Sequence, residues 1–249
     1  MKKKTLIVLL IALCLVLCSC GFHTGTYSAW GYNAGEGHVT DRVKKVEINW
    51  VDGSVQVAYH GSSELTFSET SQRKVGKDGE LRWKVDGDTL RIEYAAPGFR
   101  SWFSPEKDLT LMLPESLTLD ALKINVVSAQ VWGNDLKVGG EAQVQSVSGD
   151  VQLGFAHAPR KVDADTVSGD VELRFAQNPE AITADAVSGD MTFYLPRNAG
   201  FTAEVDSISG RVQGDLPVEK LDKENYTCGD GACSISLDSV SGDVWFNAN

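Results

Sequence analysis

The chain has 249 residues, of which 42% are hydrophobic, and it carries a formal net charge of −11 at pH 7. This acidic balance argues against nucleic acid as a partner and against direct adhesion to anionic lipid, because both are bound through clusters of Lys and Arg. It fits a protein that must stay soluble after export.

Residues 1–19 have the features of a signal peptide. Three lysines precede an apolar run over residues 5–17, which is too short to span a membrane comfortably. The run ends in Leu17-Cys18-Ser19-Cys20, which resembles the bacterial lipoprotein box, with Cys18 as a departure from its usual small or β-branched residue. The resemblance implies that Cys20 is diacylated and anchors the protein to the bacterial cell membrane on its extracytoplasmic side. An ordinary cleaved signal with an incidental cysteine is the alternative.

Residues 20–38 are rich in glycine and aromatic side chains, which predicts a flexible tether. From residue 39 to residue 249 one strand pattern follows another, without a sustained helical period. Residues 81–85 and 90–94 alternate apolar and polar side chains around Asp86-Gly87-Asp88, as the two arms of a hairpin do. We therefore predict one β domain over residues 39–249, with irregular coils in its first part.

A Val-Ser-Gly-Asp-Val corner recurs in the second half of the chain. The first residues of the five copies step by 20, 20, 21 and 32 positions, and one copy carries Arg211 in place of Asp. A fixed period of this length is typical of stacked repeats that complete one another's core. The corner residues are Ser148, Gly149, Asp150, Ser168, Gly169, Asp170, Ser188, Gly189, Asp190, Ser209, Gly210, Ser241, Gly242 and Asp243.

Each repeat contains two strands with apolar side chains at alternate positions. Val162 and Ala164 precede one corner, and Val171, Leu173 and Phe175 follow it. Two strands of about five residues and two turns fill such a coil, so equivalent strands of successive coils run parallel, about 4.8 Å apart. The prediction is an all-β fold, a single-stranded parallel β-solenoid with coils of about 20 residues that become regular from about residue 124. An antiparallel sandwich is the alternative.

Repeated Ser-Gly-Asp-Val corners behind a lipoprotein signal resemble a bacterial β-strand-repeat family that bears the label "putative adhesin", a domain of otherwise unknown function. The resemblance covers roughly residues 40–247 and is strongest over residues 124–247. It implies an envelope-facing β-solenoid that is associated in some members with envelope-stress systems. The motif is specific for the fold and says little about chemistry.

The corner aspartates are predicted to stack along one edge, and a second row precedes the corners. Like charges at strand spacing repel one another, and a bound calcium ion could relieve the repulsion. We favour a simpler interpretation, in which Asp accepts hydrogen bonds from turn amides and Gly supplies an unusual backbone angle. No other cofactor is predicted. The second row consists of Asp165, Asp185, Asp206 and Asp238.

Two stretches depart from the repeat, and we expect both to be contact surfaces. Residues 217–234 contain Cys228 and Cys233, which are predicted to form a structural disulfide because an exported protein can keep one. Residues 97–105 contain Trp102 and Phe103, which are predicted either to contact a ligand or to cap the solenoid.

These features favour a non-catalytic envelope lipoprotein that acts as an adhesin or surface-interaction scaffold. Its expected partners are the membrane, through the lipid anchor, and a cell-wall glycan or an envelope protein. The first alternative is an accessory protein of an envelope-stress sensing system. The second is a carbohydrate-active β-helix enzyme that uses acidic residues. The four histidines show no metal-ligand spacing and no catalytic partner motif, so we expect neither a metal nor an enzyme activity.

Overall fold

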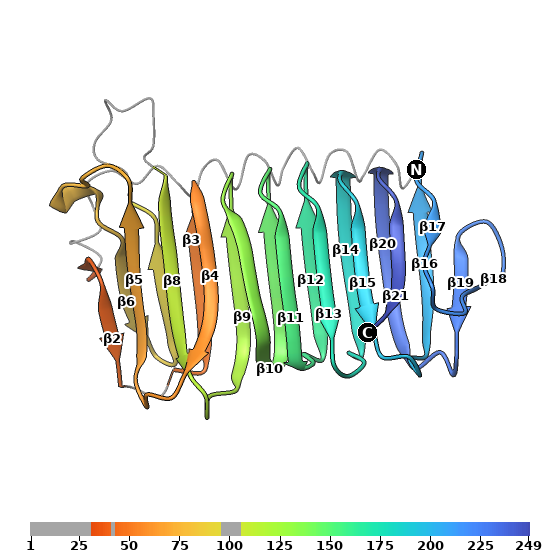
Figure 1. The fold of residues 1–249 in the computed structure, drawn as a ribbon, viewed down its shortest axis with the longest axis horizontal. Coiled ribbons are helices and arrows are strands. Elements are labelled where there is room, and N and C mark those ends of the chain that lie inside the picture. Colours follow the sequence, from red (N-terminus) through yellow and green to blue (C-terminus); the bar gives the residue numbers. More distant parts are fainter. Residues whose placement is uncertain (1–30, 41–42, 96–105) are drawn as a thin grey trace.

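The computed structural model describes residues 31–40, 43–95 and 106–249. Its strands lie side by side along one long axis, in two layers that we call sheet A and sheet B (Figure 1). Within the described residues, helical structure is limited to a single 3-10 turn, η2 (Lys77–Gly79), and no helix is long and apolar enough to cross a membrane.

The two sheets share one long strand, β10, which begins in sheet B and ends in sheet A. Sheet A has the spatial order β1 (Asn33–Ala34), β6 (Arg82–Asp86), β7 (Thr89–Glu93), β3 (Lys45–Trp50), β9 (Leu119–Val126), β10 (Gln130–Ser146), β12 (Lys161–Thr166), β14 (Ala181–Ser188), β20 (Cys233–Ser241), β16 (Phe201–Ser207), β19 (Asn225–Cys228) and β18 (Glu219–Lys220). Sheet B has the order β2 (Gly37–Val39), β5 (Leu65–Ser71), β8 (Lys107–Pro114), β4 (Gly53–His60), β10, β11 (Val151–His157), β13 (Val171–Phe175), β15 (Met191–Leu195), β21 (Val244–Ala248) and β17 (Val212–Gln213).

The regular repeats pair in parallel, as predicted. In sheet B, Val151 lies between Val131 and Val171, and Val171 lies beside Met191. The step of 20 residues keeps equivalent side chains in one column. At the two ends of the stack the pairing is antiparallel, between β1 and β6, β2 and β5, and β18 and β19. The sheet system is therefore mixed rather than parallel throughout.

Stacking order departs from chain order at both ends. The first coil, β3–β4, lies between β7–β8 and β9–β10. The last coil, β20–β21, lies between β14–β15 and β16–β17. The 32-residue step of the final corner arises because the chain first builds the terminal coil β16–β17, adds β18–β19, and then returns to fill the place beside β14 and β15. The sequence suggested that the coils stack in chain order. At these two ends that prediction is wrong.

Part of the predicted tether belongs to the fold. β1 pairs with β6 and β2 pairs with β5, so residues 33–34 and 37–39 are strand residues at the N-terminal end of the stack. The signal peptide and residues 20–30 lie outside the described residues.

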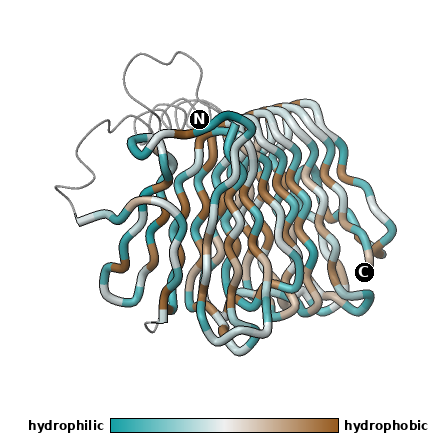
Figure 2. The backbone as a smooth tube through the Cα atoms, turned by 60° about the vertical axis from the view of Figure 1, so that its left-hand side comes forward, coloured by the Kyte–Doolittle hydropathy of each residue, from teal (hydrophilic) through white to brown (hydrophobic). Residues whose placement is uncertain are grey.

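Inward-facing apolar side chains form the core as continuous columns, because alternate residues of every strand point to the same side. Figure 2 shows these hydrophobic positions alternating with hydrophilic ones along each coil. Phe155 stacks on Phe175 with ring centroids 5.3 Å apart. The ring centroid of Phe246 lies 5.7 Å from that of Phe193 and 4.8 Å from that of Phe201. These ring contacts join the inserted last coil to the coils on either side.

The corners stack so closely that they exclude a side chain at the glycine position. A Cβ on Gly169 would collide with the carbonyl oxygen of Gly149, and one on Gly242 would collide with that of Gly189. Gly189 and Gly242 also have φ values of 131° and 134°. Close approach of the backbone therefore explains all three glycines, and at Gly189 and Gly242 the predicted unusual backbone angle adds a second reason.

Hydroxyl side chains close the corners from both sides. The buried Ser146 hydroxyl donates to the carbonyl of Gly149 at 2.6 Å and accepts from its N–H at 2.9 Å. Thr166 makes the same pair of bonds with Gly169. On the outside, the Ser168 hydroxyl donates to the carbonyl of Val147 in the preceding coil at 3.3 Å. These bonds give the buried N–H and C=O groups of Gly149 and Gly169 partners within the protein.

A buried ion pair closes the N-terminal end of the core. Lys107 is 0% exposed, and its ammonium lies 2.6 Å from Glu69 and donates to the carbonyl of Gly79 at 2.9 Å. The same ammonium lies 4.2 Å from the ring centroid of Tyr94 and 5.1 Å from that of Trp50. Burial lowers the pKa of Lys107, and the carboxylate of Glu69 opposes this effect.

We expect Gly169→Ala to destabilise the fold by about 3 kcal/mol, because the added methyl group would overpack a corner that cannot move without breaking its stack. Gly154→Ala is the matched control, since the nearest atom to a Cβ there lies 3.5 Å away. Urea unfolding followed by circular dichroism measures both variants. Equal stability of the two variants would contradict the close-approach explanation.

Candidate functional site

The C-terminal end of the stack is open on one side. Beyond β16, sheet A continues with β19 and β18, whereas no described strand follows β17 in sheet B. At the other end both sheets continue past the parallel strands, sheet A with β6 and β1 and sheet B with β5 and β2. Sheet A thus overhangs sheet B by two strands, about 9.6 Å, and leaves a step above the edge of β17.

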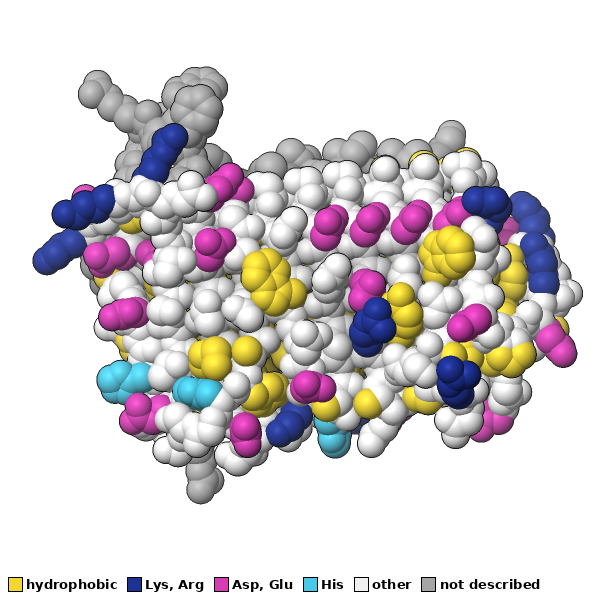
Figure 3. All heavy atoms as spheres, viewed as in Figure 1, with side chains coloured by type: hydrophobic (Ala, Val, Ile, Leu, Met, Phe, Trp, Pro, Cys, Tyr) yellow, Lys and Arg dark blue, Asp and Glu magenta, His cyan; other side chains and the backbone are white. Residues whose placement is uncertain are grey.

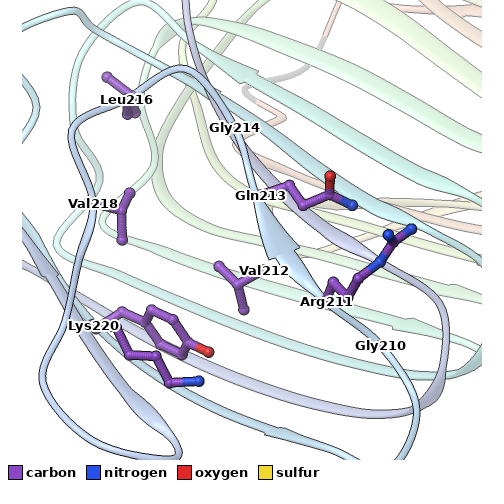
Figure 4. Close-up of a pocket in the computed structure, with 9 residues that line it drawn as sticks. Gly210, Arg211, Val212, Gln213, Gly214, Leu216, Val218 and Lys220 are labelled. Atoms are coloured by element: carbon purple, nitrogen blue, oxygen red, sulfur yellow. The ribbon is translucent and has the colours of Figure 1, made fainter.

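A pocket of about 550 Å³ occupies this step. In Figure 4 the side chain of Val212 points to one side of β17, whereas Arg211 and Gln213 point to the other. The loop that carries Leu216 and Val218 runs around the pocket. The lining residues are Gly210, Arg211, Val212, Gln213, Gly214, Leu216, Val218, Lys220 and Tyr226.

The charged side chains of this lining are both basic. The ammonium of Lys220 lies 5.2 Å from the ring centroid of Tyr226. Arg211 donates to Asp243 at 2.9 Å, yet its side chain is 78% exposed. Because a guanidinium carries five N–H donors, Arg211 keeps the capacity to bind a further carboxylate. The pocket therefore combines an apolar wall with two cations in a protein whose net charge is negative.

The corner aspartates form a continuous chain of hydrogen bonds that leads to this pocket. Asp150 accepts the backbone N–H of Asp170 at 3.1 Å, Asp170 that of Asp190 at 2.8 Å, and Asp190 that of Asp243 at 2.8 Å. Asp243 in turn accepts the N–H of Arg211 at 2.9 Å. Figure 3 shows acidic side chains in a row along one edge of the molecule. Arg211 replaces Asp where the row ends, since its coil is the last one in sheet B.

These contacts differ from the turn bonds that the sequence suggested, because each carboxylate binds the amide of the next coil. One oxygen of each carboxylate is engaged in this way. Within residues 31–40, 43–95 and 106–249, no group of three or more His, Cys, Asp or Glu side chains is placed to hold a metal. The corner carboxylates thus act as acceptors for backbone amides.

The second acidic row lies in one register column of sheet A, where Asp165, Asp185, Asp238 and Asp206 lie on neighbouring strands. Burial, reinforced by the charges of Asp165, Asp238 and Asp163, raises the pKa of Asp185 to about 7. Burial also raises the pKa of Asp165, which a hydrogen bond from Gln145 partly offsets. Asp185 therefore binds a proton near neutral pH, and the stacked charges are reduced.

A family model, Toastrack DUF4097, matches residues 44–246 of the chain. The chain belongs to the Toastrack DUF4097 family. Its fold is similar to that of a "putative cell adhesion protein" from Clostridium sporogenes, with a TM-score of 0.50 and 15% identity over 87% of this chain and 100% of the other. A "putative adhesin" from Bacteroides fragilis gives a TM-score of 0.44 and 14% identity over 86% of this chain and 97% of the other. No curated protein matches the chain.

The Toastrack chain does not form the predicted disulfide. Cys228 and Cys233 are buried free thiols. They flank Phe201 on opposite sides, Cys228 through β19 and Cys233 through β20. Two strand spacings, about 9.6 Å, separate them, whereas a disulfide joins Cα atoms about 4.4–6.8 Å apart. Burial raises the pKa of the Cys233 thiol to about 12, which keeps it protonated.

The other predicted site residues divide into two groups. Cys20, Trp102 and Phe103 lie outside the described residues of the Toastrack chain. The 217–234 insertion forms β18 and β19, and it supplies Lys220 and Tyr226 to the pocket. Sequence reasoning missed these two residues and the role of Arg211. The one signal that pointed to Arg211 was its departure from Asp at the corner.

We expect Asp185→Asn to raise the free energy of unfolding by about 1–2 kcal/mol at pH 8 and to change it little at pH 4. The folded-state pKa of Asp185 is about 7, above its ordinary value of 3.8, so folding favours the protonated carboxyl and stability from this group is lost as pH rises from about 4 to 7. Amide replacement removes that loss. Urea unfolding at both pH values measures the effect, with Asp86→Asn at the exposed hairpin turn as control. If Asp185→Asn changed the free energy of unfolding equally at pH 4 and pH 8, the raised pKa of Asp185 would be refuted.

Proposed function

We propose that this Toastrack chain is a lipid-anchored protein of the bacterial cell envelope that acts by binding, as an adhesin or surface-interaction scaffold, and not by catalysis. The observation that carries the proposal is the composition of the pocket above β17. Its lining holds apolar side chains and two cations, and none of its nine residues carries a carboxylate, an imidazole, a thiol or a serine hydroxyl. Such a lining suits the recognition of an apolar, negatively charged partner.

The scaffold supports a binding role in a second way. Backbone hydrogen bonds, glycine corners and the aspartate row tie the regular coils together, so the β17 side of the pocket belongs to a stack of paired strands. A preorganised surface loses little conformational entropy when a partner binds. The cell-adhesion description of the Clostridium sporogenes structure is compatible with this role.

Anchoring rests on the residues before the described fold. We expect the full chain, expressed in a bacterial host, to fractionate with membranes, and Cys20→Ala to move into the soluble extracytoplasmic fraction because two acyl chains give a stable anchor. Cys18→Ala is the matched control and should stay with the membrane. Fractionation followed by mass determination of the mature chain checks the result. Membrane retention of Cys20→Ala would exclude lipidation at this residue as the anchor.

Binding to the wall is tested by co-sedimentation of residues 21–249 with purified cell-wall sacculi, with and without calcium and with a chelator. Saturable binding, with serum albumin as the acidic control protein, is the expected outcome. Loss of binding in chelator would restore a calcium role for the aspartate rows. Release of soluble glycan would favour the carbohydrate-active enzyme. Absence of binding in every condition would leave a protein partner of an envelope-stress system as the better proposal.

A further inference from the structure

The step at the C-terminal end leaves places for strands in sheet B that the described chain does not fill. Sheet A continues for two strands beyond β16, and the spacing of neighbouring strands is about 4.8 Å, so one or two further strands would fit beside β17. We propose that this edge binds a short extended segment of another polypeptide, which alternates apolar and acidic residues, as an added strand of sheet B. The inference rests on the proposed binding function and names its partner class.

The backbone of β17 is oriented for such pairing. In a parallel ladder, the N–H and C=O of one residue point to the same neighbouring strand, and successive residues alternate between the two neighbours. The carbonyl of Arg211 accepts the N–H of Val244 at 2.8 Å, so Arg211 faces β21. The N–H and C=O of Val212 therefore face the other edge, where no described strand pairs with them. An edge of this kind is a template for strand addition.

The neighbouring side chains define the chemistry of the added strand. Its inward residues would meet Val212, Val218 and Tyr226, so they are expected to be apolar. Its outward residues would lie beside Arg211, which faces away from Val212 and has spare donors. An acidic residue beside Arg211 would continue the aspartate row, in which each corner carboxylate accepts a backbone N–H from the next corner. Cross-strand pairs of opposite charge stabilise a sheet, whereas like charges destabilise it.

The size of the pocket fits a short segment. A strand residue occupies roughly 160 Å³, from its rise of about 3.3 Å, its strand spacing of about 4.8 Å and a sheet separation of about 10 Å. The pocket of about 550 Å³ thus has room for about three such residues. Two large apolar side chains at the same end are also exposed, Ile208 by 51% and Leu221 by 63%. They would extend the apolar contact beyond the pocket itself.

The test uses the full chain in detergent and a fluorescein-labelled, end-capped hexapeptide that alternates valine and glutamate. Fluorescence anisotropy is expected to show saturable binding at least ten-fold tighter than that of the matched peptide of valine and lysine. Equal affinity for the two peptides, or binding of neither, would overturn the proposal.

Two variants separate strand pairing from simple charge attraction. Val212→Pro removes an N–H that does not serve the β21 ladder, and proline is tolerated on such an edge, so the fold is kept while affinity for the glutamate peptide falls at least ten-fold. Val212→Ala shortens the same side chain but keeps the N–H, so the difference in peptide affinity between the alanine and proline variants measures the contribution of strand pairing. Arg211→Glu changes an exposed side chain and should invert the preference, so that the lysine peptide binds more tightly; it also provides a test if the proline variant does not fold.

Other occupants give distinct results. Displacement of the peptide by polygalacturonate, with affinity for the glycan unchanged in Val212→Pro, would make the pocket an acidic-glycan site and overturn strand addition. Self-association that Val212→Pro abolishes, without peptide binding, would replace the peptide by a second copy of the chain. Sacculus binding that persists when peptide binding fails keeps the proposed function and overturns only this inference, whereas peptide binding without sacculus binding does the reverse.

Discussion

The close contact between stacked corners sets the register of the regular coils, and the core follows from that register. Gly169 approaches the backbone of Gly149 so closely that no side chain fits at this position. At this distance the backbone N–H of Asp170 can donate to the Asp150 carboxylate. Both contacts require successive corners to lie in register. Once the corners are in register, the alternate residues of each strand fall into columns, and the Phe and Val columns form a continuous core.

A solenoid must end, and the two ends of this molecule do so differently. At the N-terminal end, antiparallel strands extend both sheets, and the buried pair of Lys107 and Glu69 joins two of these strands, β8 and β5. A buried ion pair adds little net stability, but it requires its partners to be placed accurately. At the C-terminal end only sheet A is extended. The open edge of β17 and the pocket above it follow from this imbalance.

The acidic residues have two different physical roles. Those of the corners each accept a backbone amide, and their row ends at the cation of Arg211. The column through Asp165 and Asp185 faces neighbouring carboxylates, and burial together with those charges raises the pKa of Asp185 to about 7. A repeat that is copied without change therefore brings a cost, since the same charge recurs at every strand spacing. Protonation near neutral pH reduces that cost.

The repeat, the strand alternation and the parallel stacking of the regular coils can be predicted without the structure, because a 20-residue period and apolar residues at every second position are local patterns. The order of the coils at the two ends, in contrast, depends on long-range contacts. Val46 lies beside Leu122, and Ile182 lies beside Ile235, through pairings that no local pattern encodes. That order separates Cys228 from Cys233, sets Arg211 at the end of the aspartate row and leaves β17 at an edge, because each of these features depends on contacts between residues far apart in the chain.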